Sequence, residues 1–392
     1  GLGDVYKRQQ LAWLEASEGN PEAMITRLQE AISAHPTALG PRLVLARYYF
    51  RTGKLDKVGP MFAPLNDLQR QAPPVLELTA QVQLAQGDYK DARLTLEQLI
   101  EASPTTAQYH FLLAQAAGGS GDAAAMKQGL ARAAELDPTH VPSLTALARL
   151  AMEERAAEDF DRYLQALVRI APESTEVLRL QALAAQRAGN AGAAAEFAQR
   201  AHAAGPSTQT VLELAASQRA AGEQDRAREL LQDWLSEHPG DTPVRLALAR
   251  YLLLENDTRS AKAQYEAVLE LEPDNIDALN NLAWNLRLED SSRALEYIRR
   301  AAKLAPEQAA VLDTLAVIEH LNGEHRVAYR NIQRALTAAP GNPTIRYHKA
   351  MIESALGEND RAVGTLQELL GSTTAVFPER EKAEELLAKL IQ

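Results

Sequence analysis

The sequence predicts an all-α fold, a right-handed α-solenoid (superhelix) of about eleven helical hairpins with a capping helix at the C-terminus. Three series of residues with one common period support this prediction. Alanine recurs every 33 or 34 residues, at Ala12, Ala46, Ala80, Ala114, Ala148, Ala182, Ala215, Ala249, Ala283, Ala316 and Ala350. Proline recurs with nearly the same period, at Pro36, Pro73, Pro104, Pro138, Pro172, Pro206, Pro239, Pro273, Pro306 and Pro340. Glycine marks the middle of most repeats, at Gly19, Gly53, Gly87, Gly121, Gly189, Gly222, Gly323 and Gly357. Internal repeats of this length form pairs of helices that stack on their neighbours.

The repeat at 307–340 illustrates why each unit folds as a hairpin. Its segments 310–321 and 326–338 place apolar residues three and four positions apart, which is the spacing of one helical face. Gly323 suits the left-handed residue that ends a helix, and Pro340 cannot continue one. Neither helix can bury its second apolar face within the hairpin, so the unit requires neighbours on both sides. A small residue in the alanine series lets the two helices approach closely.

Four repeats depart from the pattern. The repeat at 51–74 contains Pro60 and Pro64, so we expect its second helix to be broken or displaced. The turn at 153–155 lacks its glycine, and Asn256 replaces the glycine in another repeat, as the next-best residue for that conformation. The turn at 288–290 is one residue short. None of these departures suggests a domain boundary, so residues 10–374 are predicted to form one solenoid.

The two ends of the chain differ from the repeats. Residues 1–9 resemble a translated sequencing adapter, which identifies them as a library scar and the chain as a fragment of a longer protein. Residues 375–392 contain an amphipathic segment whose acidic residues come first, as suits a helix N-terminus. We expect this segment to cap the last hairpin with Leu386, Leu387, Leu390 and Ile391.

Composition excludes several classes of protein. The formal net charge of −11 argues against a general nucleic-acid-binding protein, which needs clustered Lys and Arg. Cysteine is absent, which excludes a disulfide framework, a thiolate metal site and a thiol nucleophile. Hydrophobic residues make up 46% of the chain but aromatic residues only 5%, a balance that favours closely packed helices over strands. No apolar run approaches the roughly 18 residues of a membrane span.

No motif supports catalysis or cofactor binding. The eight histidines include no pair at the i, i+4 spacing of a helical metal site. The run 118–121, Gly-Gly-Ser-Gly, lacks the Lys-Ser/Thr of a phosphate loop, and we interpret it as a loosened hairpin turn. No Gly-x-Ser-x-Gly elbow occurs. The sequence therefore predicts a protein that is not an enzyme, with no catalytic residue, no cofactor and no metal site.

The informative residues are those that the hairpin turns toward the concave face of the solenoid. On the first helix of each hairpin they lie three before, one after and four after the series alanine. Across ten repeats these positions hold six Arg against two Asp or Glu, although the chain is acidic overall. Arg and aromatic residues are enriched at binding hot spots. The residues predicted to bind a partner in this groove are Arg47, Arg149, Arg179, Arg219, Arg250, Asn280, Asn281, Trp284, Arg287, Asp313, His320, Tyr347 and Met351. The alternative is that these arginines lie over neighbouring hairpins or pair with carboxylates between repeats.

The residues that define the repeat are also those of the tetratricopeptide repeat (TPR) family. In 307–340 they are Leu315, Ala316, Gly323, Ala328, Ala335 and Pro340. Tyr265 and Phe62 resemble the family's aromatic residue of the second helix. The resemblance covers about residues 10–374. The Lys and Asn pattern of the family's chaperone-binding members is not matched. We therefore expect a non-catalytic scaffold that binds a partner protein or peptide in its groove and does not bind nucleic acid.

The closing stretch allows a more specific resemblance. Residues 342–348, 377–380 and 384–387 resemble the end of the long TPR lipoproteins of the PEP-CTERM/exosortase system, which accompany bacterial exopolysaccharide production and surface-protein sorting. This resemblance implies an extracytoplasmic protein that meets the membrane only through a lipid anchor lost with the N-terminus. Two alternatives remain open. One is a cytoplasmic assembly adaptor, and the other is the scaffold or regulatory half of a glycosyltransferase or polysaccharide-export machinery. The oligomeric state stays unspecified.

Overall fold

A computed structural model describes residues 20–371 and 377–391 of the chain. The predicted scar at 1–9 lies outside the described residues. Within the described ranges every regular element is helical, with 23 α-helices and no strand, which confirms the predicted fold class. The right-handed superhelix stays a prediction. The chain divides into two compact units, residues 1–183 and 184–392. Their boundary falls within one helix and coincides with none of the four departures from the repeat.

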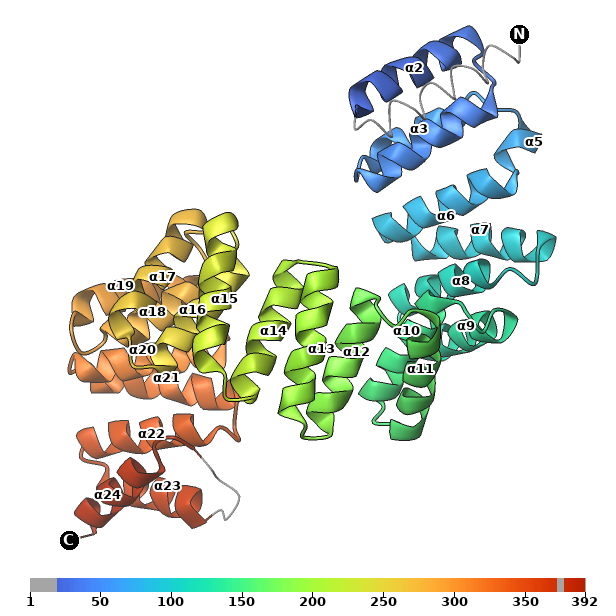
Figure 1. The fold of residues 1–392 in the computed structure, drawn as a ribbon. Coiled ribbons are helices and arrows are strands. Elements are labelled where there is room, and N and C mark those ends of the chain that lie inside the picture. Colours follow the sequence, from blue (N-terminus) through green and yellow to red (C-terminus); the bar gives the residue numbers. More distant parts are fainter. Residues whose placement is uncertain (1–19, 372–376, 392) are drawn as a thin grey trace. The chain divides into compact units, whose positions relative to one another are not determined.

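Unit 1 begins with α2 and α3 and continues with regular hairpins such as α6/α7, α8/α9 and α10/α11 (Figure 1). Its helices are α2 (Pro21–Ala34), α3 (Leu39–Arg51), α4 (Gly59–Phe62), α5 (Asp67–Arg70), α6 (Pro73–Gln86), α7 (Tyr89–Ala102), α8 (Ala107–Gly119), α9 (Ala123–Leu136), α10 (Val141–Glu153), α11 (Ala157–Ile170) and α12 (Thr175–Arg187), in which the boundary between the units falls.

Unit 2 contains the hairpins α14/α15, α16/α17, α18/α19, α20/α21 and α22/α23, each packed against the next (Figure 1). Its helices are α13 (Ala191–Ala204), α14 (Thr208–Ala220), α15 (Gln224–Glu237), α16 (Thr242–Leu254), α17 (Thr258–Leu271), α18 (Ile276–Leu286), α19 (Ser291–Leu304), α20 (Ala309–Leu321), α21 (His325–Ala338), α22 (Pro343–Ala355), α23 (Asn359–Gly371) and α24 (Arg380–Leu390).

The alanine series lies where the helices approach each other. All ten members within the described residues are buried; Ala182 is the most exposed at 9%, and Ala249, Ala283 and Ala316 are at 0%. A larger side chain at these positions would overpack the contact between helices. The alanine series therefore recurs along the sequence with the same period as the close contacts between helices.

The turns within the hairpins follow the predicted backbone conformation. Gly323 has φ +81°, in the left-handed region that costs glycine nothing. The repeat without a turn glycine places Arg155 there with φ 58°, and Asn256 has φ 60°. One expectation was wrong. Gly118 and Gly119 are not part of a loosened turn, because α8 continues through Gly119.

The repeat after α3 has a broken second helix, as Pro60 and Pro64 predict. A 3₁₀ turn at Leu55–Lys57 and the short helices α4 and α5 replace it. Val58, Phe62 and Leu65 are each buried, so the broken segment still covers the core. The buried Arg42 holds it in place: its Nη1 donates to Met61 O at 2.9 Å and its Nε donates to Pro36 O at 2.6 Å.

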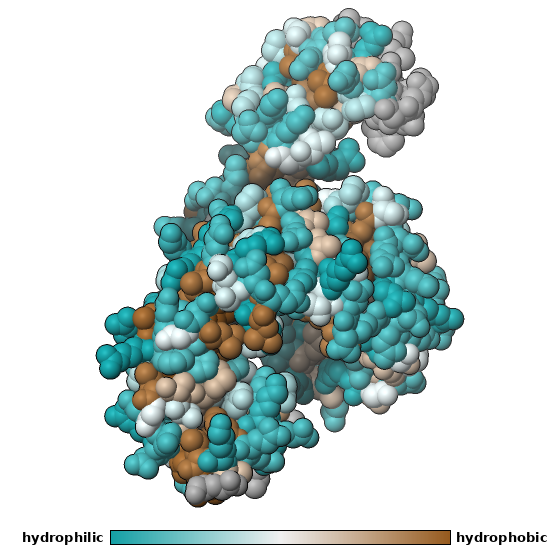
Figure 2. Space-filling view, turned by 90° about the vertical axis from the view of Figure 1, so that its left-hand side faces the viewer, coloured by the Kyte–Doolittle hydropathy of each residue, from teal (hydrophilic) through white to brown (hydrophobic). Residues whose placement is uncertain are grey.

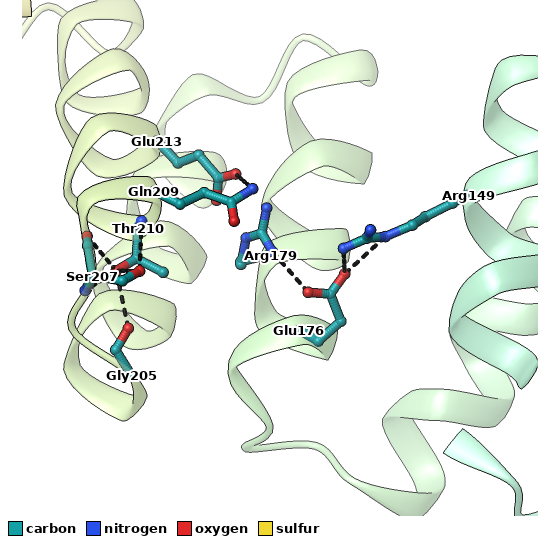
Figure 3. Close-up of polar contacts among 8 residues, drawn as sticks. All are labelled: Arg149, Glu176, Arg179, Gly205, Ser207, Gln209, Thr210 and Glu213. Atoms are coloured by element: carbon teal, nitrogen blue, oxygen red, sulfur yellow. Dashed lines mark hydrogen bonds and ion pairs between the residues drawn. The ribbon is translucent and has the colours of Figure 1, made fainter. Parts of the chain in front are cut away.

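Side-chain hydrogen bonds fix where several first helices begin. Ser207 caps α14: its Oγ accepts from Thr210 N at 3.2 Å, and Thr210 Oγ1 accepts from Ser207 N at 3.0 Å (Figure 3). Elsewhere the side chain six residues after the series proline bonds to the proline carbonyl. Arg42, His110, Arg245 and Arg346 make this contact. Some first-helix cations therefore serve the fold rather than a ligand.

Polar pairs also join the two helices of a hairpin. The residue three after the series alanine bonds to the residue twelve positions later on the second helix. The pairs are Gln83–Thr95 at 3.0 Å, Glu319–Asn331 at 2.8 Å and Glu353–Thr365 at 2.9 Å. Burial raises the pKa of Glu319. The hydrogen bond from Asn331 lowers this pKa, but its effect is smaller than that of burial. In the α14/α15 hairpin the second position is Leu230, and the buried Gln218 Oε1 has no hydrogen-bond partner among the described residues.

The last helix, α24, packs on α23. Ala383 is fully buried, and Leu386, Leu387 and Leu390 are partly buried against a cluster that includes Phe377. Ile391 differs from expectation: it is 65% exposed, because it follows the end of α24. Among the described residues, no helix is both long and apolar enough to cross a membrane.

Candidate functional site

The first helices of unit 1 line a hollow of about 620 Å³. Five of its ten lining residues occupy positions that the repeat geometry predicts for the groove: Phe50, Gln81, Leu84, Gln115 and Gly118. They come from α3, α6 and α8, which are first helices of successive hairpins. The hollow is completed by Ala85, Tyr89, Leu112, Gly119 and Met126. Leucine, aromatic and methionine side chains with two carboxamides suit an apolar side chain of an extended peptide.

Two glycines shape one wall of this hollow. A Cβ atom on Gly119 would lie 2.2 Å from Tyr89 Cε1, and one on Gly118 would lie 2.6 Å from Met126 Sδ. The two glycines therefore let Tyr89 and Met126 lie directly against α8. The Gly-rich run that suggested a turn instead permits close packing within the helix.

Two predicted groove arginines of unit 1 share one carboxylate. Arg149 Nε donates to Glu176 Oε1 at 3.1 Å, and Arg179 Nη1 donates to Glu176 Oε2 at 2.7 Å (Figure 3). Glu176 lies at the start of α12, whereas Arg149 lies on α10, so the pair joins successive repeats. Arg149 and Arg179 therefore follow the alternative interpretation, in which these arginines pair with carboxylates between repeats. Arg47 is exposed on α3.

Unit 2 places two of its three groove arginines against aromatic rings. The guanidinium of Arg287 lies 3.9 Å from the ring centroid of Trp284, and its Nη1 donates to Trp284 O at 2.5 Å. The Arg219 guanidinium lies 5.8 Å from the ring of Tyr251, a residue that the sequence analysis missed. Arg250 is exposed on α16, next to Tyr251. Burial lowers the pKa of Arg287, which is consistent with a cation held against an indole ring.

These arginines differ from the cations of the second helices. In the described part of unit 2, no carboxylate oxygen lies within 4 Å of the guanidinium nitrogens of Arg219, Arg250 or Arg287. Second-helix cations instead pair with carboxylates of the neighbouring repeat, as in Arg228–Glu255 at 2.6 Å, Lys262–Glu289 at 2.5 Å and Arg293–Glu266 at 3.4 Å. The first-helix face of unit 2, defined by Arg219, Arg250, Trp284, Arg287, His320 and Met351, thus carries cations that no acid neutralises.

Two of the predicted groove residues are part of the interior. Asp313 is only 9% exposed, and its Oδ1 contacts Nδ1 of His348 at 2.8 Å. Tyr347 is 9% exposed and packs in the cluster that α24 covers. Burial raises the pKa of Tyr347, with smaller contributions from Glu379 and Glu385. The prediction that these two side chains face a ligand is wrong, because the neighbouring repeat and α24 cover them.

Near this face the structure brings together histidines that sequence spacing did not connect. The rings of His320 and His325 lie 4.9 Å apart across the hairpin turn, and His348 lies 5.9 Å from Trp284. Burial lowers the pKa of His320, and His325 and His348 lower it further. Across the described residues, no group of three or more His, Cys, Asp or Glu could hold a metal ion. Aromatic packing is therefore the role that the geometry supports for these rings.

The two predicted asparagines are partly engaged by their own helix. Asn281 Nδ2 donates to Asp277 O at 2.8 Å. Asn280 Oδ1 is buried without a hydrogen-bond partner among the described residues. One carboxamide is therefore bonded within its own helix, and the oxygen of the other is buried. Trp284 and the arginines remain the principal features of the face.

Comparison with known proteins identifies the repeat in three segments. Two family models, both described as tetratricopeptide repeat, match the chain: one over residues 208–251, the other over residues 78–140 and 246–309. A TPR repeat-containing protein of Pseudomonas aeruginosa is 33% identical over 122 residues. That match spans 30% of this chain and 20% of the relative's length. These findings support the TPR family for the chain.

Three solved structures with similarity to the chain align with it at low sequence identity. A tetratricopeptide repeat protein from Parabacteroides merdae superposes with a TM-score of 0.46 and 15% identity, over 56% of this chain and 99% of that one. A TPR protein of Thermus thermophilus gives a TM-score of 0.39 and 22% identity, over 47% and 99%. A chain of the APC/C hetero-tetramer Cut9–Hcn1 gives 0.44 and 13%, over 98% and 90%.

Proposed function

We propose that this stack of tetratricopeptide-type hairpins is a non-catalytic scaffold, and that the first-helix face of unit 2 binds an extended segment of a partner protein. The observation that carries the proposal is that Arg219, Arg250 and Arg287 have no acidic partner among the described residues. Two of them, Arg219 and Arg287, lie beside the aromatic rings of Tyr251 and Trp284. Arg, Trp and Tyr supply most of the binding energy at protein interfaces. A guanidinium already stacked on a ring is pre-organised for a further contact.

The charge distribution supports a role beyond folding. The chain has a formal net charge of −11, so acidic residues that could neutralise these arginines are abundant. They do so on the second helices, where Arg228 and Arg293 pair with carboxylates of adjacent repeats. Stacking of the repeats is achieved by the buried alanine series and does not require the cations of the first-helix face. A partner segment is the natural counterpart of a face that carries cations and aromatic rings together.

Site-specific cross-linking in the producing bacterium tests this proposal. A photoreactive benzoylphenylalanine at Met351, on the first-helix face, is expected to trap one defined partner. The same group at Glu296, exposed on second helix α19, serves as the matched control. The triple variant Arg250→Glu, Arg287→Glu, Trp284→Ala should lose at least about tenfold of the Met351 cross-link, since each hot-spot residue contributes about 2 kcal/mol or more. Equal cross-linking at both positions, or a yield that the triple variant leaves unchanged, would contradict the proposal.

We also propose that the scaffold serves bacterial exopolysaccharide production or surface-protein sorting of the PEP-CTERM type, as an extracytoplasmic protein tethered by a lipid. The support is the resemblance of residues 342–348, 377–380 and 384–387 to the end of the lipoproteins of that system. A Cys-free repeat region is compatible with an exported chain whose single cysteine carries the lipid.

Fractionation of the native host tests the location. The protein encoded by the complete gene is expected to carry an N-terminal cysteine that incorporates labelled palmitate, and to sediment with membranes on the extracytoplasmic side. Substitution of that cysteine by serine should release the protein from the membrane fraction and reduce surface polysaccharide or sorted protein. A protein without label in the cytoplasmic fraction would support the assembly-adaptor alternative instead.

A further inference from the structure

Three exposed leucines lie in register on consecutive repeats of unit 2. Leu254 and Leu321 are the last residues of α16 and α20, and Leu288 lies just after α18. They are 65%, 44% and 74% exposed, respectively. Each lies five residues after its series alanine. We call these three residues the leucine ridge.

The repeat itself does not require leucine at this position. In other repeats the equivalent residues are small or charged, as in Ala85, Gly119, Glu153 and Ala355. Single exposed leucines are common on protein surfaces and need no explanation. Figure 2 shows such hydrophobic patches separated by hydrophilic residues on the face that it presents. Three leucines at the same position of consecutive repeats form a regular series, which scattered residues do not.

The leucine ridge adjoins the cations of the first-helix face. Leu254 lies one helical turn after Arg250, and Leu288 directly follows Arg287. Leu288 also lies four residues after Trp284. The ridge and the arginines therefore form one strip along the ends of the first helices.

Acidic residues beside the ridge are already neutralised. Glu255 directly follows Leu254 and is bound by Arg228 at 2.6 Å. Glu289 directly follows Leu288 and is bound by Lys262 at 2.5 Å. Arg250 and Arg287 have no carboxylate partner in the part of the chain that the structure describes, so the charges that they leave on the strip are positive. A ligand with carboxylates complements them, whereas a basic ligand does not.

We propose that this strip binds an acidic, extended segment of the partner protein with a bulky apolar residue at about every third position. This inference rests on the proposed function and adds the chemistry of the partner. The first helices α18 and α20 contact each other, and packed helices lie about 8–10 Å apart. A segment in the polyproline II conformation rises about 3.1 Å per residue and makes one turn in three residues, so residues three apart share a face and span one repeat. Apolar side chains at that interval meet Leu254, Leu288 and Leu321 in turn, and the carboxylates between them meet Arg250 and Arg287.

Peptide binding to the purified full chain tests the inference. The probe is a fluorescein-labelled peptide of about twelve residues with the repeating sequence Leu-Glu-Asp, which matches the three-residue turn of polyproline II, with its rise of about 3.1 Å per residue. Two matched peptides replace either the acids with lysine or the leucines with serine. Fluorescence anisotropy at about 0.15 M salt, where long-range charge effects are screened, measures each dissociation constant. We expect the acidic leucine peptide to bind at least about tenfold more tightly than either matched peptide, a difference of about 1.4 kcal/mol.

Variants of the chain locate the site. The triple variant Leu254→Ser, Leu288→Ser, Leu321→Ser and the double variant Arg250→Glu, Arg287→Glu should each weaken binding at least about tenfold. The matched controls should change it less than about twofold. For the ridge the control is Leu271→Ser with Leu304→Ser, exposed leucines at the other end of the same hairpins. For the arginines it is Arg259→Glu with Arg326→Glu, exposed on second helices. Circular dichroism confirms that each variant is folded.

The outcomes separate this inference from the proposed function. Equal binding of the lysine peptide, or full binding by the ridge variant, overturns the inference. In that case a Met351 cross-link that still depends on Trp284 leaves the proposed function standing with a different partner chemistry. Self-association of the wild-type chain that the ridge variant abolishes would assign the leucine ridge to a second copy and also overturn the inference. If the wild-type chain shows neither the Met351 cross-link nor peptide binding, both the proposed function and this inference are refuted.

Discussion

Replacing Tyr265 with alanine is expected to lower the free energy of unfolding by about 3–5 kcal/mol, the range for deleting a buried aromatic ring. Tyr265 on α17 is 0% exposed and belongs to the core cluster of unit 2, together with Ala261, Val268 and Leu279. The ring occupies the space between the two helices of its own hairpin and the next one, so its loss leaves a cavity that helices cannot close. The measurement is urea unfolding followed by far-ultraviolet circular dichroism.

Substitution of Tyr265 by phenylalanine provides the matched control. The Tyr265 hydroxyl is buried and has no hydrogen-bond partner among the described residues, and burial raises its pKa. Removing an unsatisfied buried hydroxyl is expected to leave stability unchanged or to raise it by up to about 1 kcal/mol. Hydrogen exchange should place the loss caused by Tyr265→Ala in α16–α18, since repeat arrays open locally. Equal destabilisation by both substitutions would show that the hydroxyl, and not the ring, holds the hairpins together.

The fold could be predicted from sequence because the same types of residue recur at the same positions of each repeat. The alanine series marks where two helices touch, and Gly323 or Asn256 marks where the backbone turns. Such features depend on residues within about 34 positions of each other and recur, so chance patterns average out. The break after α3 was predictable for the same reason, because Pro60 and Pro64 cannot both lie inside one continuous helix; Pro60 lies instead in the first turn of α4.

The site could be predicted only in outline. Helical geometry places the positions of Gln81, Gln115 and Arg250 on first helices, and the hollow of unit 1 includes two of them. What each side chain contacts depends on a residue in another repeat, which periodicity does not reveal. Arg149 turns to Glu176, 27 positions away, whereas Arg250 has no such partner among the described residues. Both arginines occupy the same position in their repeats.

The glycine run at 118–121 shows a second limit. Its composition favours a turn, yet α8 continues through Gly119 because Tyr89 and Met126 fill the space that side chains on α8 would need. The packing of a neighbouring helix thus overrides the local propensity of glycine to end a helix. Local sequence identified the unusual position correctly but assigned it the wrong role.

Replacing His348 with alanine is expected to destabilise unit 2 by about 3 kcal/mol or more, the cost of removing one partner from a buried polar pair. His348 on α22 is 4% exposed, and its Nδ1 lies 2.8 Å from Oδ1 of Asp313 on α20. This contact joins the first helices of two successive repeats beneath Trp284, whose ring lies 5.9 Å from that of His348. Without His348, the buried carboxylate of Asp313 has lost its hydrogen-bond partner.

A double-mutant cycle separates this pairing from simple loss of packing. Asp313→Ala combined with His348→Ala is expected to cost less than the sum of the two single changes by about 1 kcal/mol or more, because the double variant leaves no uncompensated carboxylate. The matched control is the exposed pair Arg300–Asp274, at 3.0 Å. Arg300→Ala should cost less than about 1 kcal/mol. Additive single costs at Asp313 and His348 would mean that the two residues act only by filling space. A coupled pair would instead fix the spacing of α20 and α22. That spacing would also fix the position of the Trp284 ring, on which partner binding is proposed to depend.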